Sequence, residues 1–278
     1  MEDNHFKIID YFQKSTNVFP TVDIKGGVAI GYRDANANFG KIGFFSPFAE
    51  LRSIVNKVSK RFGFNSFANI ISSRGMYRFS EDFFKEHPEA QSALNAGTGN
   101  MITSKSFALY PNVFIRNAEY ITSETIQLYG RESNTREFRY IERRYVLPNN
   151  YLDCYNVFVP EANGTGTIGE VLSTPIIGTP MIGHTDTFIS IGQFECQAEA
   201  EACLKYIKTK FARTMLGTLK ATQHNPKDTW ANVPLQDFTA SSDINWSQSI
   251  PEIDHQLYIK YKLTNEEISF IESMIKPM

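Results

Sequence analysis

The sequence predicts a mixed α+β fold, with strands dominating the first half and helices the last third. Runs rich in β-branched and aromatic residues fill the first 45 positions and return between Met101 and Val159. Apolar residues at helical spacing occupy 197–216 and 264–275. A chain of 278 residues can bury one large core or two ordinary ones.

The first 45 residues predict a strand hairpin. "FKIIDYF" (6–12) and "VAIGY" (28–32) are strand-like runs separated by the turn-rich "STNVFPT", and the short apolar run "IGFF" follows. The next segment, "SPFAELRSIVNKVSK" (46–60), predicts a helix with Ser46 as its N-cap and Pro47 at its first position.

The middle of the chain alternates short elements with turns. "SEDFFKEH" predicts a short helix that Ser80 begins. Three further runs are typical of strands, namely "FALYPNVFI" (107–115), "YLDCYNVFV" (151–159) and "DTFISIGQF" (186–194).

Two helices are expected toward the C-terminus. The longer one runs from Gln197 to about Leu216, and the last one begins at a capping box of Thr264 and Glu267. We therefore expect three parts: a strand hairpin (1–45), a mixed α/β domain (46–236) and a helical tail packed on it (237–278).

Composition excludes several classes of protein. No run reaches the length of a transmembrane helix, and the N-terminus lacks a signal-peptide pattern, so we expect a cytoplasmic protein without a membrane partner. The three cysteines, Cys154, Cys196 and Cys203, have no metal-ligand spacing and suit a reducing compartment. We expect no metal and no bound cofactor.

Charge is strongly segregated along the chain. Residues 51–80 contain no Asp or Glu, residues 147–204 contain no Lys or Arg, and a second basic cluster follows at once. Such clustering suits a protein with an anion-facing surface, although solvated faces explain it equally well. The candidate DNA-contacting residues are Arg52, Lys57, Lys60, Arg61, Arg74, Arg78, Lys205, Lys210, Arg213, Lys220, Gln223 and Asn225.

Other motifs carry less weight. Gly164–Gly169 matches G-x-G-x-x-G, but the prolines that follow leave no room for the helix which a dinucleotide site needs. His184 and Asp186 lie in a turn, where polar side chains usually satisfy backbone groups. The arginines between 131 and 144 are interspersed with glutamates, which indicates a solvated face.

One alternative is a metal-dependent restriction endonuclease. Asp10 on one strand and Asp23-Ile24-Lys25 on the next have the order of a nuclease site, in which two acids hold a divalent cation and a lysine positions water. The glycines at 26 and 27 weigh against it, because they weaken the strand that such a site needs.

Five long stretches spread over the whole chain carry a family resemblance. They are "VFPTVDIKGGVAIGYRD", "EANGTGTIGEVLSTPIIGTPMIGHTDTFISIG", "YIKTKFARTMLGTLKATQHNP", "WANVPLQDFT" and the ending from "SDINWSQSIPEID" to "IKPM". Together they resemble the C-terminal target-recognition part of type II restriction–modification adenine-specific DNA methyltransferases, the fused kind with an NPPY active site.

The resemblance implies that residues 1–45 are the closing strands of a methyltransferase sheet and that 46–236 recognise DNA. It implies double-stranded DNA as the partner, with lysines (57, 60, 210 and 220) on phosphates and Arg74, Arg78, Gln223 and Asn225 near bases. The only Asn-Pro, at 225–226, is followed by Lys227, so no NPPY motif is present.

The missing motif implies that the chain is a truncated gene product or an isolated domain that does not methylate DNA by itself. S-adenosylmethionine is then expected to bind to the parent enzyme and not to this chain. The N-terminal strands can then pair with a methyltransferase chain or with a second copy. A DNA-binding regulator or an oligomeric interaction protein remains an alternative.

Overall fold

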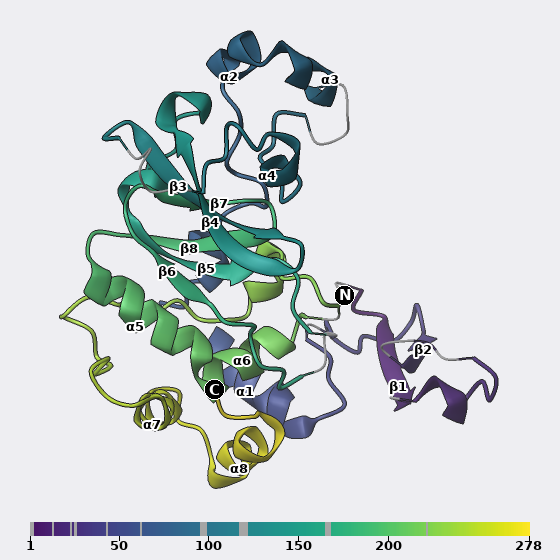
Figure 1. Ribbon diagram of the computed structural model, residues 1–278. Coiled ribbons are helices and arrows are strands. Elements are labelled where there is room, and N and C mark those ends of the chain that lie inside the picture. Colours follow the sequence, from purple (N-terminus) through teal and green to yellow (C-terminus); the bar gives the residue numbers. More distant parts are fainter. Residues whose placement is uncertain are drawn as a thin grey trace.

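The computed structural model describes residues 3–12, 14–22, 24, 27–42, 44–61, 63–94, 99–116, 122–164, 168–220 and 222–278. The mixed α+β fold class is confirmed (Figure 1). The strands are β1 (Phe6–Phe12), β2 (Val28–Arg33), β3 (Thr125–Glu132), β4 (Thr135–Glu142), β5 (Tyr155–Pro160), β6 (Ile176–Gly178), β7 (Ile182–His184) and β8 (Phe188–Phe194). The helices are α1 (Ala49–Ser59), α2 (Glu81–Glu86), α3 (Gln91–Leu94), α4 (Ser106–Leu109), α5 (Gln197–Lys208), α6 (Lys210–Gly217), α7 (Ile250–Lys260) and α8 (Asn265–Met274).

The N-terminal strands form an antiparallel hairpin that stands apart from the other sheets, at the right of Figure 1. Its register runs from Phe6 opposite Arg33 to Phe12 opposite Val28, with an irregularity between Ile8 and Asp10. Most of its side chains are exposed or only half-buried.

The body contains two three-stranded sheets, ordered β4-β3-β7 and β6-β5-β8. β3 pairs antiparallel with β4 and parallel with β7, whereas β5 pairs antiparallel with both of its neighbours. The rings of Tyr129 (β3) and Phe188 (β8) lie 4.8 Å apart, so aromatic packing joins the two sheets.

The larger core lies between the β6-β5-β8 sheet and the helices. Helix α5 packs on this sheet, and α7 and α8 lie against the outer side of α5 and α6 (Figure 1). Fully buried side chains come from every layer: Ile54, Val58, Val157, Ile191, Cys203, Ile207, Phe211, Ile253, Leu257 and Ile271. The C-terminal segment 237–278 therefore shares one core with α1, α5 and α6.

A second core, rich in aromatic residues, covers β3 and β4. The rings of Phe79 and Phe83 are stacked with centroids 3.9 Å apart, and Phe107 and Phe114 pack beside them. This cluster holds α2 and α4 over the sheet that contains β3, β4 and β7 (Figure 1).

The prediction of one long helix from Gln197 to about Leu216 is wrong, because Thr209 interrupts it and separates α5 from α6. Thr209 has an extended backbone (φ −60°, ψ 150°), and its hydroxyl accepts a hydrogen bond from the Ala212 N–H at 3.1 Å. The Asp254 carboxylate, from α7, accepts the N–H groups of Lys210 (2.9 Å) and Phe211 (2.8 Å). The caps from Thr209 and Asp254 thus begin α6 at a point where the apolar periodicity of the sequence predicts that α5 continues.

Two further expectations need correction, and others are confirmed. Helix α1 begins at Ala49, because the Ser46 hydroxyl accepts only the Phe48 N–H, before the helix. The run 107–115 starts within the short helix α4 instead of a strand. Ser80 caps α2 and the Thr264–Glu267 capping box begins α8, both as predicted.

We expect Ile253→Ala to lower the free energy of unfolding by about 2–5 kcal/mol, because it leaves a cavity in the shared core. Ile253 is completely buried, whereas Ile259 on the same helix is 64% exposed. The matched change Ile259→Ala should cost less than about 0.5 kcal/mol. Urea denaturation measures both, and equal losses would contradict a core shared with the C-terminal segment.

Candidate nucleic-acid interface

The basic residues of α1 and α6 contact the acidic C-terminal segment, which contains seven acidic and three basic residues from position 237 on. The Lys57 ammonium lies 2.7 Å from the Glu267 carboxylate and donates to the Lys262 carbonyl. Lys210 forms an ion pair with Glu272. Both lysines are therefore neutralised within the molecule.

Three more candidate DNA-contacting residues donate hydrogen bonds to backbone carbonyls. Lys205 donates to the carbonyls of Trp246 (2.7 Å), Gln248 (3.0 Å) and Ser247 (3.3 Å), just before α7 begins. Arg61 donates to the Lys260 carbonyl, and its guanidinium lies 5.3 Å from the centroid of the Tyr261 ring. Arg52 donates to the Ser46 carbonyl. These side chains hold loops and helix ends in place.

The expectation that three further residues contact DNA is corrected, because Arg213, Lys220 and Asn225 are all buried. Burial lowers the pKa of both cations below their usual values. Arg213 donates to carbonyls that include Glu170 and Lys276, and Lys220 donates to the Asn163 carbonyl at 2.6 Å. The Asn225 amide donates to the Pro160 carbonyl at 3.0 Å. None of the three is available to DNA in this conformation.

Besides Arg61, four of the proposed residues are exposed: Lys60, Arg74, Arg78 and Gln223. Arg78 donates to the Asn100 side chain at 3.0 Å. The Gln223 carbonyl accepts the Asn163 N–H at 2.6 Å, which fixes the backbone of its loop. Lys60 is the C-cap residue of α1.

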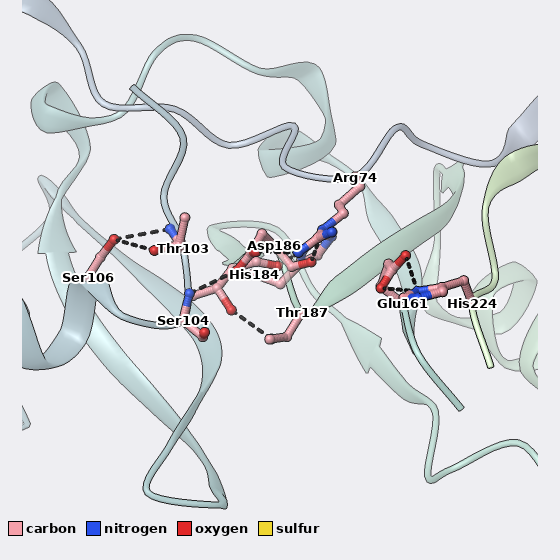
Figure 2. A network of polar contacts seen from close by, with 10 residues as sticks. Arg74, Thr103, Ser104, Ser106, Glu161, His184, Asp186, Thr187 and His224 are labelled. Atoms are coloured by element: carbon pink, nitrogen blue, oxygen red, sulfur yellow. Dashed lines mark hydrogen bonds and ion pairs between the residues drawn. The ribbon is translucent and has the colours of Figure 1, made fainter. Parts of the chain in front are cut away.

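Arg74 is held by Asp186, a residue 112 positions away. The Asp186 carboxylate lies 2.8 Å from the guanidinium, and its other oxygen accepts the Ser104 N–H at 2.8 Å. Figure 2 shows Arg74 and Ser104 on opposite sides of this carboxylate. The Arg74 side chain is 55% exposed and that of Asp186 only 11%, so a fixed acid presents the arginine to solvent.

The same edge continues to the loop that carries Gln223. The Glu161 N–H donates to the Thr187 carbonyl at 2.9 Å, and the Glu161 carboxylate lies 3.0 Å from the His224 ring (Figure 2). We call the four loops at 72–75, 103–105, 185–187 and 222–225 the loop rim. Contacts through Asp186, Thr187, Glu161 and His224 thus link the loop of Arg74 to the loop of Gln223, one from each basic region of the sequence.

His184 lies beneath the loop rim and is completely buried. Its Nδ1 is 2.8 Å from the Thr185 carbonyl, which can only accept, so this nitrogen carries the proton. Its Nε2 lies 2.9 Å from the Ser190 hydroxyl. Burial lowers the pKa of the imidazole to about 4, so it stays neutral at pH 7. His184, the last residue of β7, and Asp186, in the turn after it, thus satisfy neighbouring polar groups, as predicted.

The nuclease alternative falls partly outside the described residues, where Asp23 and Lys25 lie. Asp10 is exposed on β1, and its carboxylate accepts the Tyr11 N–H at 2.8 Å. Within the described ranges, no three His, Cys, Asp or Glu side chains gather as metal ligands. Of the glycine-rich motif, residues 165–167 are also outside these ranges.

Comparisons with known proteins add no family assignment. No protein-family model matches the chain, and no curated protein gives a significant match. Across the described ranges, no helix combines the length and apolarity needed to cross a membrane.

We expect His184 to make the fold less stable as the pH falls. Since its pKa is about 4 in the folded chain and near 6.5 when unfolded, its stabilising contribution is complete above pH 6.5. By pH 4 the loss should reach about 3 kcal/mol, because the unfolded state binds the proton more readily.

Urea unfolding between pH 4 and 7 tests this, with His184→Gln expected to flatten the pH profile. The exposed His255 provides the matched change His255→Gln, which should leave the wild-type profile intact. Identical profiles for wild type and His184→Gln would contradict the assignment.

Proposed function

We propose that this chain is the sequence-specific DNA-recognition module of a restriction–modification adenine methyltransferase and is not catalytic by itself. The resemblance of its long sequence stretches supports the class of parent enzyme. The proposal places the chain in the cytoplasm with double-stranded DNA as its partner. S-adenosylmethionine would be bound by the catalytic part of the parent enzyme, because the present sequence has no NPPY motif.

The observation that carries the proposal is the Arg74–Asp186–Ser104 arrangement of the loop rim. A guanidinium has five N–H donors, of which Asp186 takes two, through its carboxylate and its backbone carbonyl. The remaining donors suit the O6 and N7 acceptors of guanine or a phosphate. Because Asp186 is itself held by Ser104, little side-chain entropy remains to be lost on binding.

The neighbouring exposed side chains complete this chemistry. Gln223 can pair with adenine, and Arg78 carries a further cation beside the Arg74 loop. Phosphate contacts would orient the module, whereas base contacts would select the sequence. Methyl transfer to the adenine amino group would then take place on the catalytic part of the parent enzyme.

We expect the chain to bind a random-sequence DNA duplex in low salt, with an affinity that falls steeply as salt rises. Arg74→Ala should weaken this binding by roughly tenfold, because it removes a preordered guanidinium. Fluorescence anisotropy measures both effects. Lys85→Ala is the matched control, since Lys85 is also an exposed cation paired with local acids. Absence of binding in low salt would contradict the proposal.

A second function, association with another chain, is favoured by the N-terminal hairpin. It exposes large apolar side chains to solvent, including Ile9 (59%), Phe19, Val22, Ile24, Ile30 and Tyr32. Its two strands pair only with each other in the described part of the chain. Exposed strand edges and apolar faces of this kind bind other strands. We propose that the hairpin pairs with a methyltransferase chain, or with a second copy when the protein is alone.

We expect the isolated protein to sediment as a dimer at micromolar concentration, and Ile9→Asp to convert it to a monomer. The charge would have to be buried in the hairpin interface, which is strongly unfavourable. The control Ile259→Asp places the same charge on an equally exposed isoleucine of α7 and should leave the dimer intact. A monomeric wild-type protein in sedimentation velocity would contradict self-association.

A further inference from the structure

The hairpin of β3 and β4 separates its charges onto two faces. Residues directly opposite each other on antiparallel strands point to the same side, and alternate residues point to opposite sides. Arg131 lies opposite Arg136, so the two arginines share one face. Glu132 and Glu137 are their sequence neighbours and therefore point to the other face.

Glu132 and Glu137 both form ion pairs on that other face. Both contact Arg139, whose side chain is buried between the strands and α4. Arg116 adds a second cation, 3.2 Å from Glu132 and 3.8 Å from Glu137. Glu132 and Glu137 therefore do not neutralise Arg131 and Arg136, which lie on the other face of the hairpin.

Within the described ranges, no acid lies within ion-pair distance of Arg131 or Arg136. Arg131 donates to the Asn134 side chain at 2.9 Å, and Arg136 donates to the Thr174 carbonyl at 3.3 Å. Both hydrogen bonds hold the side chains in place without removing their charge.

The turn keeps the two arginines together. Ser133 and Asn134 form a two-residue loop with φ of 46° and 67°, the conformation that matches the twist of a tight hairpin. Like charges directly opposite on a sheet repel each other, which costs stability unless an anion lies nearby. Arg131 and Arg136 thus form a cationic site near the turn of the β3–β4 hairpin.

Aromatic packing supports the same face of the hairpin. The Tyr129 ring lies 4.7 Å from that of Phe138 and 4.8 Å from that of Phe188, measured between centroids. The Arg136 guanidinium is 5.5 Å from the Phe188 ring. The stack packs the hairpin against β8, and the Phe188 ring contacts the Arg136 guanidinium.

The hairpin is continuous with the loop rim. The Thr185 N–H donates to the Tyr129 carbonyl at 3.0 Å, and the hydroxyls of Thr185 and Thr187 are 2.8 Å apart. The strand that carries Arg131 is thus bonded directly to the loop that contains Asp186, the partner of Arg74, although 57 positions separate Arg74 from Arg131 in the sequence.

We infer that the β3–β4 hairpin is a β-ribbon that enters the major groove of duplex DNA, with Arg131 and Arg136 contacting phosphates or guanine edges. The major groove admits a two-stranded ribbon, and paired arginines match its acceptors and the flanking phosphates. This inference rests on the proposed DNA-recognition function and assigns it a second contacting element, which the charge pattern of the sequence does not reveal.

The test compares DNA binding and stability of the full chain with Arg131→Ala/Arg136→Ala. We expect the double variant to bind a random duplex at least roughly tenfold more weakly, with a salt dependence reduced by about one to two ions. Its urea midpoint should stay close to that of the wild type, because the removed repulsion between like charges offsets the lost contacts of Arg136 with Phe188 and Thr174.

Arg116→Ala is the matched control, because it removes an exposed arginine that contacts the opposite face of the same hairpin. Wild-type affinity in this control, together with the loss in the double variant, supports the ribbon. Equal affinity of the wild type and the double variant would overturn the ribbon while leaving the DNA-recognition function intact. No binding by the wild type in low salt would overturn both.

Discussion

The burial of the C-terminal helices against α1, α5 and α6 determines which cations this protein can offer to a ligand. Asp254 is the centre of that contact, since it accepts two N–H groups of α6 from within the core. Burial raises its pKa to about 6, and the positive end of the α6 dipole offsets part of the cost. Around it, Lys57 and Lys210 pair with acids of α8. Cations that cluster in the sequence thus form part of the contact between the C-terminal helices and the rest of the protein.

The surface that we propose for DNA consists of cations that take no part in this contact. Arg74 is supported by Asp186 from below, and the Arg131–Arg136 pair is separated from its neighbouring glutamates by strand alternation. In both cases the protein holds an arginine rigidly while leaving its charge accessible. Preordered arginines lose less entropy on binding than flexible surface lysines, which makes them suited to reading base edges.

Local rules predicted those parts of the fold that depend on neighbouring residues. The strands at 6–12 and 28–32, the Ser80 cap and the Thr264–Glu267 capping box follow from short patterns, and the structure has all of them. The break at Thr209 depends on Asp254, a residue that sequence periodicity cannot connect to it. The burial of Arg213, Lys220 and Asn225 was missed for the same reason, because charge along the chain does not reveal whether a distant acid, a carbonyl or solvent contacts each polar side chain.

Hydrogen–deuterium exchange with and without duplex DNA is the most direct test of this division between structural and DNA-facing cations. The account predicts slower exchange on DNA binding in the turn around Ser133 and Asn134 and in the loop rim, with α1 and α8 unchanged. Protection confined to α1, α6 and α8, with the turn and the loop rim unaffected, would contradict it. In that case the C-terminal segment would have to move away from the cations that it covers in this structure.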